Sequence, residues 1–468
     1  MKKRLCTCLL ALLLTAAVPA PARAASGVKA TIPTYTWELA YENVDYKNSV
    51  YPPLNYKGVT YFPMTWGYCR LLGLTSVWIE GEGLFIASWG SYGPAAGDEF
   101  PTYAATKNPK TVTATLPTYP IYVNGKRIDN SKEEYPLLNF RGVTYFPMTW
   151  RFAHEEFNWN TEWSAEENRF SIHWQIESDW GHQTSVYEVT DTAAYLVKYS
   201  SHSVPIGENE RGDTVYTTEN SQKYYTLDFA AGTLTGSERR ASYDDWARNG
   251  TDMPVGVLPE GVTIRNERAY TRDDIPAPYT PFVAHATVTV DGREYAIGEG
   301  SGDADDCGVI LTRAVRVGDY VFCNAKRFTG WKGFTNPNEE LYRIDVTAYM
   351  DAEGNTYRKS SAEAVERMDT WDIYRDYGSM KLIGVSIHND TPRGYPLVVK
   401  CQQGSSQYAG EGGVMEASAY NDGYYAMNPA TGQLELLRRF VYTDGDILTS
   451  DGHIYGIFDW KDTVEKLY

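Results

Sequence analysis

The segment whose sequence most resembles a ligand site is the acidic loop Gly300–Gly308, with the sequence GSGDADDCG. A D-x-D opening begins at Asp303 and a glycine stands at the sixth position, as in a calcium-binding loop. Two positions do not fit, because Cys307 offers a soft ligand at the fifth and Ala314 replaces the bidentate Glu at the twelfth. We interpret the segment as a solvated acidic turn, since Asp and Gly are frequent in turns.

Other catalytic and metal-binding patterns are absent from the sequence. The seven histidines include no His-x-His pair, and the cysteines include no C-x-x-C pair. Nucleophile-elbow, P-loop, HExxH and dinucleotide-binding motifs are also missing. We therefore assign no catalytic, cofactor-binding or metal-ligating residue. A glycoside hydrolase stays open, because its two carboxylates come from distant strands and leave no local spacing signal.

Residues 1–24 have the features of a secretory signal peptide. Met1–Arg4 is basic, Leu9–Val18 is apolar, and Ala22–Ala24 has the small-x-small pattern of a cleavage site. The apolar run is shorter than the roughly 20 residues of a membrane-spanning helix. We therefore expect a secreted or cell-envelope-associated protein that begins near Ala25.

The charge balance excludes some partners. The chain carries 43 basic and 60 acidic residues, and loss of the leader would change the net charge from −17 to −21. Such a surface repels phosphate backbones and anionic lipid, so we expect no nucleic-acid partner. The length predicts two to four domains.

Four cysteines follow the leader and allow two interpretations. Cys307 and Cys323 could form a disulfide between neighbouring strands of an exported protein. Alternatively all four are buried thiols, because so few cysteines in so long a chain do not form a disulfide framework. The four are Cys69, Cys307, Cys323 and Cys401.

An internal repeat organises the first third of the chain. Tyr51–Trp66 (YPPLNYKGVTYFPMTW) recurs as Tyr135–Trp150 (YPLLNFRGVTYFPMTW), at an offset of 84 residues. The shorter sequence IPTY that precedes the first block recurs at the same offset as LPTY. After one indel we align Phe85–Trp89 with Phe170–Trp174.

Each copy predicts the same small α+β module. A strand, a Lys-Gly or Arg-Gly turn and a Val-Thr-Tyr-Phe strand are followed by a helical turn and two closing strands. Pro63 or Pro147 can occupy the first helical position, and the helix would then carry Trp66 or Trp150 onto the sheet. Large aromatic residues dominate small-domain cores, so we predict an aromatic core. Its members in the first copy are Tyr61, Phe62, Trp66 and Trp78.

The second copy resembles the copper amine oxidase N-terminal-like (stalk) domain of secreted bacterial proteins. The resemblance rests on Ile121–Lys126 (IYVNGK), Arg141–Pro147 (RGVTYFP) and a terminal strand from Trp163 to Ile172. The first copy departs from it, with Leu39–Glu42 (LAYE) where VNGK is expected. The resemblance implies two tandem stalk domains, which are accessory to the enzyme that gives the family its name.

A looser β pattern follows from about residue 176. Tyr225–Phe229, Tyr342–Val346 and Tyr425–Pro429 each follow an aromatic strand, as in propeller blades, although their intervals exceed one blade. The capping box Ser360–Glu363 predicts one helix that ends before Gly378. Its apolar stripe consists of Val365, Met368, Trp371 and Tyr374.

These observations predict a mainly β protein with short helices, in which two small α+β stalk-like modules precede a β-rich, propeller-like region. The expected segments are a signal peptide (1–24), repeat 1 (28–90), a linker (91–115), repeat 2 (116–175) and the C-terminal region (176–468). The leading hypothesis is a non-catalytic protein whose modules are a spacer or docking platform for a C-terminal surface that recognises an extracellular or cell-wall component. An extracellular hydrolase of wall glycan or peptide is one alternative, and a carbohydrate-binding or ligand-sensing module is the other.

We predict that the mature protein carries no stoichiometric copper and oxidises no primary amine. Amine oxidase chemistry needs a His-x-His pair and a Tyr followed by an acid, whereas the nearest triplet here is Asn55–Lys57 (NYK). Copper(II) favours several imidazoles, yet only His154 and His173 lie in the second copy, where the first has Arg70 and Ser88. Elemental analysis of protein purified without chelator measures this. Retention of about one copper per chain through dialysis would contradict it.

Overall fold

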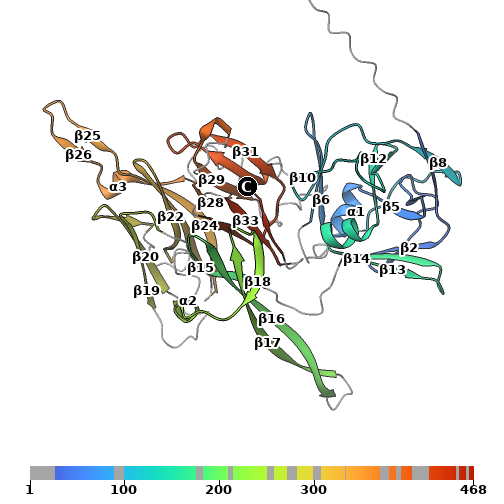
Figure 1. The fold of residues 1–468 in the computed structure, drawn as a ribbon, viewed down its shortest axis with the longest axis horizontal. Helices are drawn as coiled ribbons and strands as arrows, with labels where there is room; N and C mark the ends of the chain where they lie inside the picture. The colour runs from blue at the N-terminus through green and yellow to red at the C-terminus, as the bar shows by residue number, and fades with distance from the viewer. Residues whose placement is uncertain are drawn as a thin grey trace, which may run out of the picture.

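The computed structural model describes residues 27–88, 100–174, 183–208, 214–249, 258–270, 282–298, 307–331, 334–368, 379–385, 392–402, 421–449, 453–459 and 463–467. The expected signal peptide and residues 300–306 of the acidic loop lie outside them. The described chain is mainly β with short helices, as the sequence predicts. Figure 1 shows the two sequence copies at one end of the molecule, beside the C-terminal region.

Three strands from each copy form one six-stranded sheet. They are β1 (Val28–Thr31), β4 (Leu54–Tyr56), β5 (Val59–Pro63), β8 (Thr111–Ala114), β11 (Leu138–Phe140) and β12 (Val143–Pro147). The strand order is β11-β12-β5-β4-β1-β8, and a bridge between Thr115 and Asn139 joins the two edges into a nearly closed barrel. β8 lies in the segment expected to be the linker and corresponds to β1, so the second copy begins before Leu116.

The two copies are related by a pseudo-twofold axis. β5 and β12 run antiparallel, with Phe62 opposite Phe146, and these two residues are 84 positions apart. β1 and β8 pair in the same way, with Lys29 opposite Thr113. A residue can lie opposite its own counterpart only where the axis passes between the two strands. Phe62 and Phe146 are fully buried in one core that both copies share.

The remaining strands are exchanged between the copies. β2 (Thr36–Leu39) and β3 (Glu42–Val44) of the first copy join β13 (Trp159–Ser164) and β14 (Arg169–Trp174) of the second. Reciprocally, β9 (Ile121–Val123) and β10 (Lys126–Arg127) join β6 (Leu74–Ile79) and β7 (Gly83–Ser88). β2 and β9 each pair in parallel with a strand of the other copy. Neither copy therefore completes its sheets alone.

Strand pairing corrects the alignment of the last strand. Trp78 lies opposite Leu84 in the first copy, and its counterpart Trp163 lies opposite Phe170. The turn between β13 and β14 is one residue longer than the turn between β6 and β7, so the offset rises by one. The predicted match of Ser88 with His173 is therefore wrong. A shift of one residue in a strand also exchanges its two faces.

The helical turns begin later than the sequence predicts. Pro63 and Pro147 end strands β5 and β12 and are not at the first helical position. Helix α1 (Trp66–Leu71) begins after Thr65, whose hydroxyl accepts a hydrogen bond from the backbone N–H of Tyr68 at 3.3 Å. Such an N-cap satisfies one of the donors that a helix start leaves unpaired. The second copy has a wider π-helical turn, η1 (Arg151–Glu156).

The C-terminal region consists of five antiparallel sheets in chain order, together with the hairpin β25 (Ala348–Met350) and β26 (Thr356–Arg358). The second sheet packs on the third, the third on the fourth, the fourth on the fifth, and the fifth on the first. The described sheets thus pack on one another in the order second, third, fourth, fifth and first, and the propeller-like closure expected from the sequence stays a prediction.

The sheets comprise β15 (Gln183–Val189), β16 (Ala193–Glu208), β17 (Thr214–Asp228) and β18 (Thr233–Ser237); β19 (Val262–Tyr270), β20 (Phe282–Val290) and β21 (Arg293–Ile297); β22 (Val309–Val317), β23 (Tyr320–Trp331), β24 (Phe334–Asp345) and β27 (Val365–Arg367); β28 (Ser379–Val385), β29 (Leu397–Gln402), β30 (Gly423–Met427) and β31 (Leu434–Arg439); β32 (Gly445–Leu448), β33 (Ile454–Phe458) and β34 (Thr463–Lys466). The three predicted Tyr segments all lie on the third strand of a four-stranded sheet. Their intervals are irregular because the three-stranded sheet β19-β20-β21 lies between the first two.

The predicted long helix after Ser360 is wrong. The capping box forms, but helix α3 (Ser361–Ala364) is a single turn, and Val365 belongs to β27, opposite Ile344. Pairing with β24 overrides the helical pattern, because an edge strand there completes the sheet. Trp371 and Tyr374 lie outside the described residues.

The four cysteines are buried thiols, which is the second of the two interpretations above. Burial raises the pKa of the Cys323 thiol to about 12 and raises those of Cys69 and Cys401 as well. A thiol that stays protonated is a poor nucleophile and a poor metal ligand.

The C-terminal region docks on the sheet β10-β9-β7-β6. Phe440 packs on Phe85 with ring centroids 5.4 Å apart, in a small apolar cluster with Val77. Arg439 makes two hydrogen bonds of 3.0 Å to the carboxylate of Glu82. The corresponding face of the other sheet is polar and includes Glu162, Ser171 and His173 where the first has Val77, Phe85 and Ala87.

We expect Phe440→Ala to destabilise the protein by about 3–5 kcal/mol, because it opens a cavity at this buried contact. Glu162→Ala changes the corresponding face of the other sheet and should shift stability by no more than about 0.5 kcal/mol. Chemical unfolding followed by tryptophan fluorescence measures both variants. Equal stability of the two variants would show that the contact does not hold the C-terminal region in place.

Candidate functional site

Four tryptophans of the two copies lie on the surface. Trp66 is 42% exposed and Trp78 is 49% exposed, whereas Tyr61 and Phe62 are fully buried. The prediction of a core is therefore confirmed for Tyr61 and Phe62 and wrong for Trp66 and Trp78. Trp78 shares a face of β6 with the buried Leu74 but lies four residues farther along, beyond the core. The counterparts Trp150 and Trp163 are 69% and 51% exposed.

Trp66 and Trp78 belong to a cleft of about 500 Å³, which we call cleft A. It is lined by Tyr51, Met64, Thr65, Trp66, Trp78 and Leu84 of the first copy and by Tyr119, Asn139, Gly142, Val143 and Thr144 of the second. The cleft thus exists only because the copies are intertwined. Its volume lies within the range of small-molecule sites, and its lining of aromatic walls with a few polar groups is typical of them.

A chain of hydrogen bonds forms the polar part of cleft A. The Asn139 side-chain amide donates to the Tyr119 hydroxyl at 2.7 Å, and that hydroxyl shares a hydrogen bond of 2.7 Å with Thr144. The Trp78 ring meets the Tyr119 ring edge to face, with centroids 5.0 Å apart. These contacts hold the aromatic walls in fixed positions, so the ligand surface is preorganised.

The electrostatics of cleft A are neutral. None of its eleven lining residues is charged, and charged groups lie only at its rim. Glu80 accepts a hydrogen bond from the Trp78 indole N–H at 3.2 Å, and Arg70 lies 5.5 Å from the centre of the Trp66 ring. The lining offers hydroxyl, amide and aromatic groups and contains no carboxylate, imidazole, amine or thiol, so the arrangement can bind a ligand through stacking and hydrogen bonds.

The two histidines of the second copy are held by contacts with neighbouring side chains and backbone. His154 is half-buried and stacks on Trp150 with ring centroids 4.1 Å apart. His173 is buried, accepts a hydrogen bond from the backbone N–H of Tyr41 and lies 3.2 Å from Glu38. Burial lowers the pKa of both histidines. Among the described residues no group of three His, Cys, Asp or Glu side chains could hold a metal ion.

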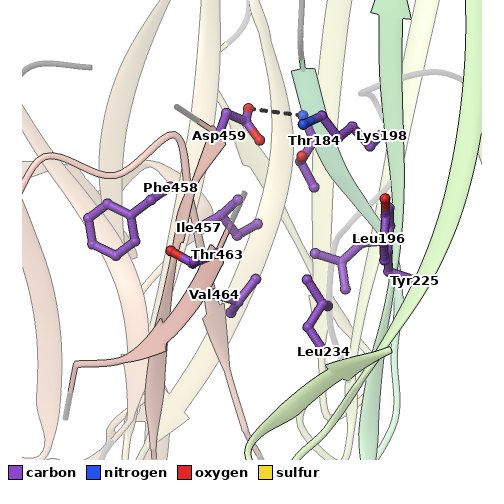
Figure 2. A pocket seen from close by; sticks show the side chains of 10 residues that line it. All are labelled: Thr184, Leu196, Lys198, Tyr225, Leu234, Ile457, Phe458, Asp459, Thr463 and Val464. Atoms are coloured by element: carbon purple, nitrogen blue, oxygen red, sulfur yellow. Dashed lines mark hydrogen bonds between the residues drawn. The ribbon is translucent and has the colours of Figure 1, made fainter. Parts of the chain in front are cut away.

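The C-terminal region contains a much smaller cavity, shown in Figure 2. It lies between the sheet β15–β18 and the sheet β32–β34 and has a volume of about 80 Å³. At its edge Asp459 accepts a hydrogen bond from the backbone N–H of Thr184 at 3.0 Å. The volume corresponds to a few water molecules, so this cavity does not admit a sugar or a peptide.

Comparison with known proteins gives no family for the chain. No protein-family model matches it. No curated protein matches it either. The resemblance to stalk domains therefore stays a prediction. No helix among the described residues is long and apolar enough to cross a membrane.

We expect the exposed and the buried tryptophans to differ sharply in their effect on stability. Trp37→Ala removes a fully buried ring and should destabilise the protein by about 3–5 kcal/mol. Trp78→Ala should cost about 1 kcal/mol or less, because half of that side chain already contacts water. Urea unfolding measures both. A large loss for Trp78→Ala would indicate a structural role for the cleft wall.

Proposed function

We propose that the protein is a non-catalytic glycan-binding protein of the cell exterior, and that cleft A is its binding site. The observation that carries the proposal is the pair of exposed tryptophans, Trp66 and Trp78, held beside a polar floor in a cleft of about 500 Å³. The exported location rests on the signal-peptide features of residues 1–24.

The chemistry of the cleft favours a sugar. A pyranose ring presents C–H groups on its faces and hydroxyls at its edges. The faces of Trp66 and Trp78 carry the negative part of the ring quadrupole, which attracts C–H groups. The hydroxyl and amide groups of Tyr119, Asn139 and Thr144 can exchange hydrogen bonds with sugar hydroxyls. A neutral lining and a net charge of −17 favour an uncharged glycan over a phosphate-bearing polymer.

This proposal moves the recognition site from the C-terminal region to the module pair. The cavity between the sheets β15–β18 and β32–β34 is too small for a sugar, and the contact through Phe440 fixes the C-terminal region to the sheet β10-β9-β7-β6. The C-terminal region then serves as a rigid body that the module pair carries to the glycan. A hydrolase is disfavoured because no Asp or Glu lines the cleft, whereas glycoside hydrolysis uses two carboxylates.

The test is retention of the purified chain on insoluble wall glycan. We expect the wild-type protein to be retained without releasing soluble sugar, and Trp78→Ala to weaken retention about tenfold, since aromatic stacking contributes about 1–3 kcal/mol per ring. Tyr357→Ala is the matched control, because it removes an equally exposed aromatic ring from the distant β25–β26 hairpin.

Two results would contradict the proposal. The first is release of reducing sugar by the wild-type chain. The second is absence of retention together with binding of a proline-rich peptide, since such peptides also dock in aromatic-lined grooves.

A further inference from the structure

We infer that the counterpart of cleft A, which we call cleft B, is a second binding site for the same class of glycan, so that one chain engages glycan at two places. The inference rests on the proposed function of cleft A. Cleft B consists of Trp150, Trp163 and Phe170 of the second copy and Tyr35, Asn55 and Thr60 of the first, with the other counterparts of the cleft A residues.

Identity between the copies is high at the two clefts as well as in the shared core. Ten of the eleven residues that line cleft A are identical at the corresponding positions of cleft B. The exception is Leu84, which corresponds to Phe170 and is replaced by a larger aromatic ring. By contrast, residues 36–50 and 120–134 share only Asp45 and its counterpart Asp129.

Two contacts that shape cleft A recur at the corresponding positions of cleft B. The Tyr35 hydroxyl shares a hydrogen bond of 2.6 Å with Thr60, as the counterparts in cleft A do at 2.7 Å. The rings of Tyr35 and Trp163 meet edge to face with centroids 5.4 Å apart, and the Phe170 ring lies 6.0 Å from the Tyr35 ring. The pseudo-twofold axis therefore reproduces the Tyr-Thr hydrogen bond and the Tyr-Trp ring contact of the site.

Packing does not explain why both exposed tryptophans recur. Trp150 and Trp163 are more than half exposed, so their burial contributes little to folding. The outer faces of the two four-stranded sheets have diverged, since Val77 of the Phe440 contact corresponds to Glu162 and Phe85 corresponds to Ser171. The chain tolerates such substitutions but keeps large apolar rings exposed to water at both clefts. It therefore retains these rings for contact with a ligand.

The clefts differ enough to bind with unequal affinity. Phe170 adds an aromatic surface to cleft B, and His154 stacks on Trp150 where Arg70 lies near Trp66 in cleft A. Burial lowers the pKa of His154, so cleft B is also neutral near pH 7. Two linked sites on one polymer raise the overall affinity by about 10²–10⁴-fold when both can engage together.

The decisive experiment is calorimetric titration of the full chain with chitohexaose, with variants of each cleft. We expect two sites per wild-type chain. Trp66→Ala with Trp78→Ala should leave one site, and Trp150→Ala with Trp163→Ala should leave the other. Trp163→Phe keeps an aromatic face and should restore the second site. Because all four side chains are largely exposed, the variants should keep the circular dichroism of the wild type.

The outcomes separate this inference from the proposed function. One site in the wild type, lost on changing cleft A and unaffected by changing cleft B, would overturn the second site and leave the first intact. A single site that is lost only when cleft B is changed would overturn the assignment of cleft A. No binding of chitohexaose or insoluble wall glycan by the wild-type chain would overturn both.

Discussion

The antiparallel pairing of β5 with β12, centred on Phe62 and Phe146, is the constraint on which the rest of the N-terminal structure depends. It sets the copies face to face across a pseudo-twofold axis, and each copy must then complete its outer sheets with strands of the other. Two short modules that would each bury little surface alone share one large core. The clefts follow directly from this exchange, because each takes its tryptophans from one copy and its polar floor from the other.

The same symmetry is broken on the outer faces, and the break decides where the C-terminal region lies. One sheet presents an apolar face that covers Phe440, whereas the other carries Glu162 and His173, with the Glu38 carboxylate 3.2 Å from the His173 ring. Burying that second face would strip water from charged groups without new partners, which is costly. Because the outer faces of the two copies differ, one of them binds the C-terminal region and the other does not. The positions that form the clefts stayed nearly identical.

The sequence predicts much of the local structure and little of its arrangement. The repeat, the β-rich class and the hairpin turns are visible, and Lys57–Gly58 and Arg141–Gly142 adopt the positive φ angles that two-residue hairpins need. Strand exchange is not visible, because alternating hydrophobic patterns look the same whichever copy provides the partner strand. The exposure of Trp66 and Trp78 was also missed, since aromatic content alone does not show where a core ends. The recurrence of both tryptophans at corresponding positions of the two copies was the available signal.

A site shared between two copies links binding to folding. A single copy would retain Trp66 and Trp78 but would lose Tyr119, Asn139 and Thr144, so it would present two rings on a surface without a floor. Two separate chains of one copy each could build the same pair of clefts only as a symmetric dimer, with identical residues meeting across the axis as Phe62 meets Phe146. Joining both copies in one chain removes the dependence on concentration that such a dimer has. It also allows the outer faces to differ, which a symmetric dimer forbids. The covalent repeat thus keeps two clefts with nearly identical lining residues and frees one face to hold the C-terminal region.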